Sequence, residues 1–476
     1  MLIPFWSLED LPLDLSSPLC GENSLPATLV EYLKRADVFG EVLIFARSDQ
    51  LKKFQKGDGT VSSLLREMRQ GILGPFQLVE SVKDLVVLDE EALDLVVSVL
   101  DSGVSKVVVQ VPSPFLQGQA LEGLVTALEG RIPRERLVLL PKMKNGDGVE
   151  TLLENFDSWC ESLRPHTNGF LFDLRSLGDG WRGKLVEAAE KMKGPRGKED
   201  QPGTHIEVAF LCPPETVDVS LVSGLASALC KTSCRMSFPG PHSGEGPEGA
   251  PFVDLFAATL KSDRPDGLFT TVVCDESGVA LGLVYSNVQS LHAAVECMRG
   301  VYWSRSRGGL WRKGDTSGAW QGLLSIDVDC DRDAIRFRVV QQGEPPAFCH
   351  LQRRTCWSAA AGLRALEETL KGRLKTAPAG SYTKRLFEDP QLLRHKLLEE
   401  AQELSEATEK DHVAAEAADL IFFALTRCTA AGVSLPDIEA HLDRRALKLK
   451  RRPGNAKQER ILQAARELNQ GHLNGS

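Results

Sequence analysis

Hydrophobic positions in the first half of the chain come in short continuous runs, each followed by a segment with helical periodicity. Five runs rich in Val, Ile, Leu and Phe lie at 41–48, 106–112, 136–141, 169–174 and 205–211. Continuous apolar runs of this length are typical of strands buried on both faces, as in parallel α/β sheets. The pattern predicts an α/β domain over residues 1–237, and we interpret it as a degenerate, partial β/α barrel.

A stretch rich in Gly and Pro, "FPGPHSGEGPEGAP", follows this domain and predicts a linker over 238–253. No strand and helix flank its glycines as a phosphate loop requires, so a linker is favoured over a nucleotide site. Short strands then dominate over 254–366, with a hairpin expected around Glu276, Ser277 and Gly278. This segment predicts a small α+β domain.

Helical periodicity takes over from residue 380 onward. Asp389 followed by Pro390 is a helix start signal, and amphipathic helices are expected over 391–408 and the two segments that follow it. The pattern predicts an all-α bundle over 380–457 and a polar tail over 458–476.

Composition narrows the functional classes. The chain has 476 residues, a net charge of −9 and a pI near 5.6, which argues against a general nucleic-acid binder. Its 11 cysteines are irregularly spaced, which favours a reduced, cytoplasmic protein over a disulfide framework. The N-terminus lacks a basic signal-peptide region, and no apolar run approaches the ~18 residues that span a bilayer, so no membrane association is expected.

Metal-ligand residues concentrate in the middle of the chain. The stretch "DVDCDRD" contains Asp329, Asp331 and Asp333, which would share one face of a strand, and Cys330, which would point to the other. The stretch "CHLQRRTC" adds Cys349, His350 and Cys356. Carboxylate oxygens suit Mg²⁺ and thiolates suit Zn²⁺.

Three protein ligands with an open fourth position are typical of catalytic zinc. His350 would complete the tetrahedron or accept a proton from a zinc-bound water. Buried cysteines beside a solvated acidic turn are the plainer alternative, since free Cys is often buried.

The stretch "YWSRSRGGLWRKGDTSG" concentrates positive charge in this acidic chain. Its guanidinium, ammonium, hydroxyl and backbone N–H groups suit phosphate binding, although a solvated basic loop is the alternative. The substrate-binding candidates are Ser304, Arg305, Ser306, Arg307, Trp311, Lys313, Thr316, Ser317 and Gly318.

Acidic pairs spaced i,i+3 mark the first two C-terminal helices. Glu400 with Glu403, and Glu416 with Asp419, each place two carboxylates on one helix face. Taken alone, the first pair is expected on a solvated helix face. The second pair lies in a helix so apolar that we expect it to face a bundle interior. Two such pairs across a bundle would hold Mg²⁺ for phosphoanhydride hydrolysis, with Lys396 as a phosphate-binding cation.

These motifs resemble two known families. One set of stretches resembles phosphoribosyl-AMP cyclohydrolase, namely "RPDGLFTTVV", "GVYWSRSRGGLWRKGDTSGAWQ", "DCDRD" and "CH…TC". A second set resembles phosphoribosyl-ATP pyrophosphohydrolase, namely "SYTKRLFEDP", "KLLEEAQEL" and "EAADLIFFAL". Their order, after an extra N-terminal region, is similar to that of fungal multifunctional histidine-biosynthesis proteins. The chain stops at Ser476, without the histidinol dehydrogenase domain of many such proteins.

The resemblance implies two consecutive reactions. Phosphoribosyl-ATP would be hydrolysed to phosphoribosyl-AMP and pyrophosphate with Mg²⁺ at Glu399, Glu400, Glu403, Glu416 and Asp419. The adenine ring of phosphoribosyl-AMP would then be opened, with zinc at Cys330, Cys349 and Cys356, Mg²⁺ at Asp329, Asp331 and Asp333, and His350 as general base. Zinc ligands from two subunits imply a homodimer.

Two other functional classes remain open. One is a nucleoside triphosphate pyrophosphohydrolase with a vestigial or structural zinc domain. The other is a non-enzymatic scaffold that dimerises through zinc, which a closed four-ligand site would favour. In the N-terminal domain, Asp173 and Asp179 lie near the end of a predicted strand, where ordinary loop acids are favoured over a catalytic site.

Overall fold

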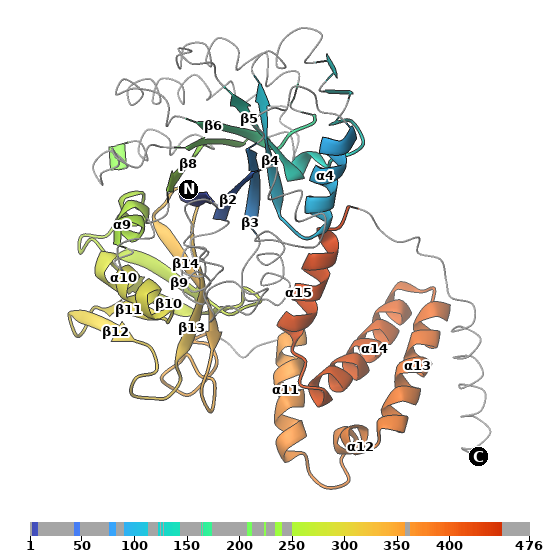
Figure 1. The fold of residues 1–476 in the computed structure, drawn as a ribbon. Helices are drawn as coiled ribbons and strands as arrows, with labels where there is room; N and C mark the ends of the chain where they lie inside the picture. The colour runs from blue at the N-terminus through green and yellow to red at the C-terminus, as the bar shows by residue number, and fades with distance from the viewer. Residues whose placement is uncertain are drawn as a thin grey trace, which may run out of the picture. The chain divides into compact units, whose positions relative to one another are not determined.

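The computed structural model describes most of the chain beyond residue 250 and the strands of the N-terminal half (Figure 1). It divides into two compact units, Met1–Arg353 with Leu447–Leu449, and Arg354–Ala446 with Lys450–Ser476. The predicted tail at 458–476 lies outside the described residues. These are 2–7, 42–47, 76–81, 90–112, 122–123, 125–126, 128–142, 163, 165–173, 207–211, 223–224, 234–239, 250–357 and 362–449.

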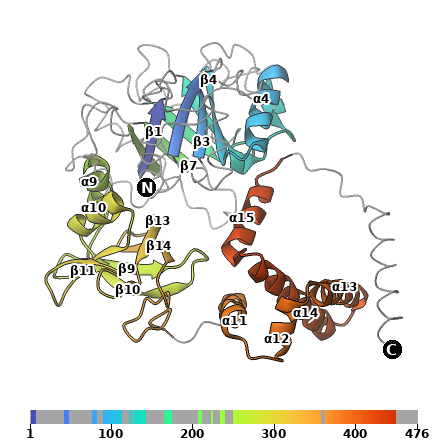
Figure 2. The same cartoon turned by 60° about the horizontal axis from the view of Figure 1, so that its bottom comes forward.

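The first unit begins with parallel strands that close into a barrel (Figures 1 and 2). Each strand pairs in parallel with the next, and the last pairs with the first, so that Leu2 lies opposite Met236. The strands are β1 (Leu2–Ser7), β2 (Val42–Arg47), β3 (Phe76–Ser81), β4 (Lys106–Pro112), β5 (Leu137–Lys142), β6 (Gly169–Asp173), β7 (Glu207–Leu211) and β8 (Cys234–Pro239).

The five predicted runs are strands β2, β4, β5, β6 and β7, but the expectation of a partial barrel is wrong. The strands that complete the barrel have the sequences LIPFWS, FQLVES and CRMSFP, in which polar residues or proline interrupt the apolar positions. Closure also requires pairing between β1 and β8, at opposite ends of the domain. A search for continuous apolar runs therefore misses both the strands and the closure.

The barrel is packed by large apolar side chains of its described strands. Val108, Leu139 and Phe170 are buried, and Phe170 stacks on Phe172 with ring centres 6.0 Å apart. The helix α4 (Glu90–Asp101) buries its apolar stripe through residues that recur with helical spacing, namely Leu93, Val96, Val97 and Leu100.

A central domain over residues 250–353 follows the barrel. Its sheet has the order β10-β9-β14-β13, in which β9 and β14 are parallel and the outer pairs antiparallel. A separate ribbon pairs β11 with β12, and α10 packs against β10 and β11 (Figure 2). The elements are α9 (Ala250–Ala258), β9 (Phe269–Cys274), β10 (Ala280–Ser286), α10 (Val288–Cys297), β11 (Val301–Ser304), β12 (Gly309–Arg312), β13 (Gln321–Val328) and β14 (Ala334–Gln341).

The predicted hairpin of the central domain is confirmed. Asp275 stabilises its turn by accepting hydrogen bonds from the backbone N–H groups of Ser277, at 3.1 Å, and Val279, at 2.9 Å. Gly278 has a φ of 82°, a conformation that glycine adopts without steric cost. The domain core contains Val273, Phe337 and Tyr302, whose hydroxyl donates to Gln321 Oε1 at 2.7 Å.

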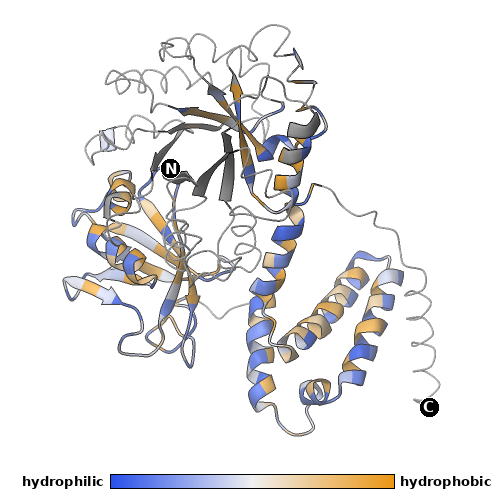
Figure 3. Cartoon of the chain, in the orientation of Figure 1, coloured by the Kyte–Doolittle hydropathy of each residue, from blue (hydrophilic) through white to orange (hydrophobic). Residues whose placement is uncertain are grey.

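The helical domain of the second unit contains α11 (Gly362–Thr376), α12 (Tyr382–Glu388), α13 (Pro390–Glu406), α14 (Lys410–Ala430) and α15 (Leu435–Ala446). Asp389 caps α13 by accepting from the N–H groups of Gln391 and Leu392, as the Asp-Pro signal predicts. Leu386, Leu393 and Phe423 form its core. Figure 3 shows apolar and polar positions alternating around α13 and α14.

Two predicted domain boundaries differ from the structure. The helix α9 begins at Ala250, inside the predicted linker, because the linker's last four residues, "APFV", continue into the apolar run of this helix. The helix α11 crosses the predicted boundary at residue 366 and packs with α12 and α14. It belongs to the helical domain, which the sequence pattern placed from residue 380.

Within the described residues, no single helix has the length and apolar character needed to cross a membrane. One bent pair, α14 with α15, meets the length and composition test jointly, with an angle of 106° between the helices.

Candidate active sites

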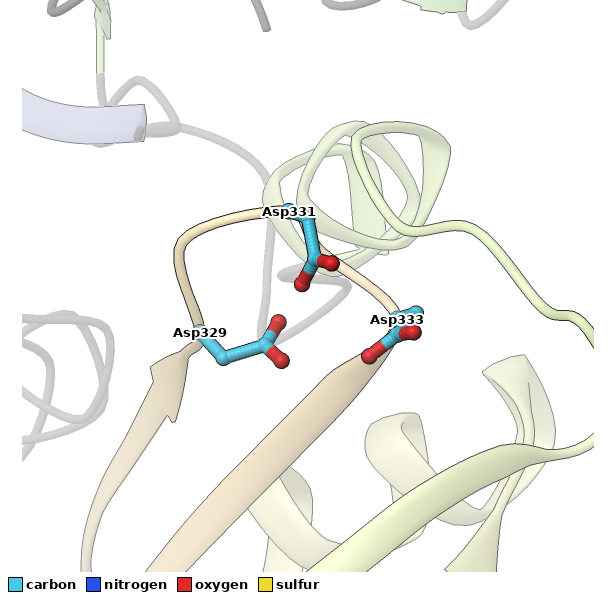
Figure 4. A group of neighbouring side chains, drawn as sticks. All are labelled: Asp329, Asp331 and Asp333. Atoms are coloured by element: carbon cyan, nitrogen blue, oxygen red, sulfur yellow. The ribbon is translucent and has the colours of Figure 1, made fainter.

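The three predicted aspartates gather in the turn between β13 and β14. The carboxylate oxygens of Asp329, Asp331 and Asp333 lie within 4.8 Å of one another and point toward a common centre (Figure 4). Alternation along a strand is not the cause, because β13 ends at Val328 and the aspartates lie in the turn. The positive φ of Arg332, 69°, reverses the chain. The grouping is therefore as predicted, but its structural reason is different.

Mutual repulsion dominates the electrostatics of this turn. The pKa of Asp333 is raised, chiefly by the charge of Asp331, with burial, Asp329 and Asp263 adding to the effect. Asp263 lies in the loop before β9. A hydrogen bond from the Lys261 N–H to the Arg332 carbonyl, at 2.8 Å, joins this loop to the aspartate turn. Converging carboxylates that repel one another suit a hard divalent cation.

The predicted zinc ligands are placed differently. Cys330 lies exposed in the aspartate turn, Cys349 is partly buried, and Cys356 is exposed. The thiol of Cys349 lies 3.9 Å from His350 Nδ1 and accepts from the Leu351 N–H at 3.5 Å. Among the described residues, the groups with ligand atoms within 4.8 Å are two sets of carboxylates, and neither includes a cysteine.

The basic stretch folds into the β11–β12 ribbon and the loop after it. Arg305, Ser306 and Arg307 are exposed at the turn of the ribbon, where the hydroxyl oxygens of Ser304 and Ser306 are 3.3 Å apart. Trp311 packs against Tyr302 with ring centres 5.9 Å apart. The turn therefore presents cations and hydroxyl groups to solvent, as phosphate binding would require.

Lys313 differs from this expectation because its side chain points inward. It is 5% exposed, and its ammonium group donates to the carbonyls of Ala319, at 3.3 Å, and Ala347, at 3.2 Å. These hydrogen bonds hold the following loop to the domain, and the ammonium group does not face solvent.

The predicted residues of that loop, Thr316, Ser317 and Gly318, are exposed. The loop is closed by a hydrogen bond from the Gly318 N–H to the Gly314 carbonyl at 2.8 Å. Gly314 has a φ of 96°, and a Cβ there would collide with the backbone of Trp320. A side chain at Gly314 would therefore displace the loop.

The helical domain holds the second carboxylate group. Ligand oxygens of Glu400 and Glu403 on α13 and Glu416 on α14 lie within 4.8 Å of one another. Glu400 is buried, Glu416 partly buried and Glu403 exposed. Partial loss of solvation raises the pKa of Glu403 although its side chain is exposed, and the charges of Glu400, Glu416 and Glu399 raise it further.

A lysine balances part of this charge. Lys396 Nζ lies 2.8 Å from a carboxylate oxygen of Glu400, 2.9 Å from one of Glu399 and 5.5 Å from the centre of the Phe423 ring. Burial lowers the pKa of Lys396, but its hydrogen bonds to the two glutamates outweigh this and raise it. The predicted phosphate-binding cation is thus also the counter-ion of the carboxylates.

Two predicted ligands lie outside this group. Glu399 is turned toward Lys396, and Asp419 is exposed instead of facing the bundle interior. The buried residues of α14 all follow Asp419 along the helix; they are Phe423, Leu425, Thr426 and Thr429. Sequence reasoning also missed His412, which lies 3.0 Å from Glu416 at the i,i+4 spacing.

Two family models match the C-terminal half of the chain. The model described as phosphoribosyl-AMP cyclohydrolase matches residues 282–358, and the model described as phosphoribosyl-ATP pyrophosphohydrolase matches residues 363–446. The first match contains the aspartate turn and the three cysteines, and the second contains the glutamate group.

Several similar proteins are named for histidine biosynthesis. The histidine biosynthesis bifunctional protein his7 of Schizosaccharomyces pombe is 51% identical over 221 residues, covering 46% of this chain and 52% of that protein. A histidine biosynthesis trifunctional protein of Komagataella pastoris is 53% identical over 207 residues, covering 44% and 24%. The chain thus spans about half or less of these relatives.

A shorter relative is covered almost completely. The histidine biosynthesis bifunctional protein HisIE of Pyrococcus furiosus is 33% identical over 198 residues, which are 38% of this chain and 93% of that protein. The chain therefore belongs to the family of histidine-biosynthesis proteins in which a phosphoribosyl-AMP cyclohydrolase domain precedes a phosphoribosyl-ATP pyrophosphohydrolase domain.

Proposed function

We propose that this chain is a bifunctional hydrolase that converts phosphoribosyl-ATP to phosphoribosyl-AMP and pyrophosphate, and then opens the adenine ring of phosphoribosyl-AMP. The observation that carries this proposal is the pairing of two carboxylate groups with two family matches. Each group lies within the segment matched by one of the two hydrolase models.

The helical domain would perform the first reaction. Glu400, Glu403 and Glu416 fit an oxygen-coordinated Mg²⁺, which supplies neutralisation of the phosphate charge when bound. Lys396 forms an ion pair with Glu400. Coordination of Mg²⁺ by Glu400 would weaken that ion pair. Glu399 and Asp419, which lie outside the group, would complete the site as the substrate and metal bind.

The central domain would perform the second reaction. Asp329, Asp331 and Asp333 fit a second Mg²⁺, and the thiolates of Cys330, Cys349 and Cys356 suit Zn²⁺, which lowers the pKa of a bound water. His350, whose Nδ1 lies 3.9 Å from the Cys349 thiol, would accept the proton from the attacking water.

A homodimer would explain the placement of the cysteines. No described set of ligand atoms within 4.8 Å contains Cys330 or Cys349. Ligands contributed by two copies of the chain would assemble a thiolate site that one copy does not. The resemblance to phosphoribosyl-AMP cyclohydrolase supports this homodimer, and the irregular cysteine spacing supports a cytoplasmic location.

Product analysis tests both reactions. The purified full chain is incubated with phosphoribosyl-ATP and Mg²⁺, with and without a zinc-selective chelator, and the products are resolved by chromatography. We expect ring-opened product without chelator and accumulated phosphoribosyl-AMP with it. Unchanged phosphoribosyl-ATP in both samples would refute the first reaction.

The two alternative functions are tested by comparing wild type with the Cys330→Ser variant on phosphoribosyl-AMP and on a panel of nucleoside triphosphates. Hydrolysis of several triphosphates, with no ring opening even at saturating zinc, would favour a general pyrophosphohydrolase with a vestigial zinc domain. Absence of turnover together with zinc-dependent dimerisation, measured by light scattering, would favour the scaffold.

A further inference from the structure

Tyr285, at the end of β10, holds two arginines against its ring. The guanidinium carbon of Arg305 lies 4.0 Å from the ring centre, and that of Arg264 lies 4.4 Å from it. Both distances are within the ~6 Å range of cation–π contacts. Arg264 comes from the loop before β9 and Arg305 from the turn of the β11–β12 ribbon, so this arginine–tyrosine cluster joins three separate segments.

The loop before β9 fixes the orientation of Arg264. Its Nε and Nη2 donate to the two carboxylate oxygens of Asp266 at 2.9 Å and 2.7 Å. The hydroxyl of Ser262 closes the same loop by donating to the Leu268 carbonyl at 2.7 Å. A guanidinium carries five N–H donors, so Arg264 retains donors for a ligand after its bidentate pair with Asp266.

Arg305 is exposed and, within the described part of the chain, has no carboxylate within ion-pair distance. With one acid for two cations, the cluster keeps a net positive charge. The two guanidinium groups lie within about 8 Å of each other because each is near 4 Å from the same ring centre. An anion bound between their donors would offset their repulsion.

The cluster lies at the same end of the sheet as the aspartate turn. Tyr285 pairs with Thr270 on β9, and Thr270 pairs with Ala334 on β14, directly after Asp333. Two strand spacings of ~4.8 Å separate Tyr285 from Ala334, or about 10 Å. At this backbone separation, one nucleotide could contact both the cluster and the turn.

A purely structural role would explain less of this arrangement. Stacking on Tyr285 would tether the ribbon to the sheet, but one arginine would be enough. A second cation at the same ring, carrying no acid of its own and facing solvent, adds repulsion that an anionic ligand removes. Arginine is also the residue whose planar fork matches phosphate oxygens.

We propose that Arg264 and Arg305, held by Tyr285, form a phosphate clamp that binds a terminal phosphomonoester of the cyclohydrolase substrate. The purine of the same molecule would then lie toward Cys330 and the aspartate turn. The clamp rests on the proposed function, since it assigns part of that reaction's substrate to named residues. Neither Arg264 nor Tyr285 is among the substrate-binding residues that the sequence pattern predicts.

Equilibrium binding of AMP and adenosine to the full chain tests the clamp without turnover. Wild type and the variants Arg305→Ala, Tyr285→Phe and Tyr285→Leu are titrated by calorimetry. The control is Arg312→Ala, which removes the same charge from the same ribbon, at the end away from its turn. Wild type and all variants have the same helical domain, so any nucleotide that binds there contributes equally. Differences in affinity between the variants therefore report on the clamp.

We expect Arg305→Ala to weaken AMP binding by about 10- to 100-fold and to leave adenosine binding unchanged, as for lost charged hydrogen bonds. Tyr285→Phe should retain AMP affinity because the ring remains, whereas Tyr285→Leu should lose it. Arg312→Ala should stay within about 2-fold of wild type.

Equal losses in Arg305→Ala and Arg312→Ala would overturn the clamp, because they would indicate a diffuse charge effect. Unchanged AMP affinity in Arg305→Ala would overturn it as well. Turnover of phosphoribosyl-AMP by wild type, measured in parallel, separates this failure from failure of the proposed function. Loss of turnover with intact phosphate-dependent AMP binding would refute the reaction and retain the clamp.

Discussion

The aspartate turn and the glutamate group differ in how the repulsion among their carboxylates is balanced. Each gathers three carboxylates within 4.8 Å. The glutamates lie on two helices, where Lys396 neutralises Glu400 and His412 contacts Glu416. The aspartates lie in a five-residue turn, and among the described residues no lysine or arginine is within ion-pair distance of them.

This difference predicts how each group depends on its metal. Helix α13 carries its own counter-ion, so the glutamate group is partly balanced before any ion binds. The aspartate turn would need a cation from solution, such as the proposed Mg²⁺, to offset the repulsion that raises the pKa of Asp333. The helical site should therefore tolerate metal removal better than the turn.

The largest expected effect separates the two sites by activity. Glu403→Gln should lower pyrophosphate release from phosphoribosyl-ATP by about 100-fold or more, because it removes a carboxylate that converges on the proposed ion. Ring opening of supplied phosphoribosyl-AMP should be unchanged. Glu406→Gln on the same helix is the matched control, because Glu406 lies outside the glutamate group and accepts from Gln402 Nε2 at 2.9 Å. Equal losses in both variants would contradict the metal-ligand role.

The predictability of the two sites from sequence follows the same contrast. Helical spacing placed Glu400 and Glu403 on one face of α13, because the α-helix has a fixed period. It failed for Asp419, because the face of α14 that is covered depends on packing against other helices. The spacing of the aspartates predicted that they form a group. It predicted a strand face, whereas they lie in a turn, whose side chains follow no fixed period.

Long-range contacts were the least predictable features. Closure of the barrel depends on β1 meeting β8, and the arginine–tyrosine cluster on three segments meeting at one ring. Arg264 occurs in "RPDGLFTTVV", a motif of the resemblance, but nothing in that motif alone indicates its contact with Tyr285. Side-chain type and spacing carry local information, whereas these features depend on tertiary pairing.

A second variant provides a fully balanced carboxylate for the comparison. Glu367 is 1% exposed, pairs with Arg364 and Lys371 at 2.7 Å and 2.9 Å, and accepts from the Leu435 N–H at 2.7 Å. Glu367→Gln should lower the free energy of unfolding of the helical domain by about 2–3 kcal/mol, measured by urea denaturation of the full chain followed by circular dichroism.

The control for that variant is Glu368→Gln. Glu368 pairs with Arg354 at 2.9 Å and is 36% exposed, so its loss should cost less than about 1 kcal/mol. Burial raises the pKa of Glu367, but its hydrogen bonds and ion pairs outweigh burial and lower it. Its stabilising contribution is therefore present at neutral pH and is lost as the pH falls through its folded pKa. Equal effects of the two variants would indicate that burial is unimportant here.

A smaller effect tests the counter-ion directly. Lys396→Met should lower the free energy of unfolding of the metal-free helical domain by about 1 kcal/mol, because Glu399 and Glu400 then lose their shared cation. Mg²⁺ should restore part of this loss, as a cation of higher charge takes the lysine's place. Lys384→Met is the control, since Lys384 contacts Glu388 at 3.7 Å on the exposed surface. A Lys396→Met protein whose melting temperature equals that of wild type without Mg²⁺ would contradict the balancing role.

The smallest expected effect is the pH dependence of stability in the metal-free protein. The pKa values of Asp333 and Glu403 are raised in the folded state, so the folded chain binds these protons more tightly than the unfolded chain. Their contribution to stability is therefore greatest below the ordinary carboxylate range, near pH 4, and is lost as the pH rises through the folded pKa. Bound Mg²⁺ reverses this sign because it favours the ionised carboxylates. Melting temperatures measured from pH 4 to pH 7, with and without Mg²⁺, should show a metal-induced rise that grows with pH. Asp331→Asn should shrink this rise more than Glu399→Gln does, because the turn has no internal cation; the opposite order would reverse the comparison between the two sites.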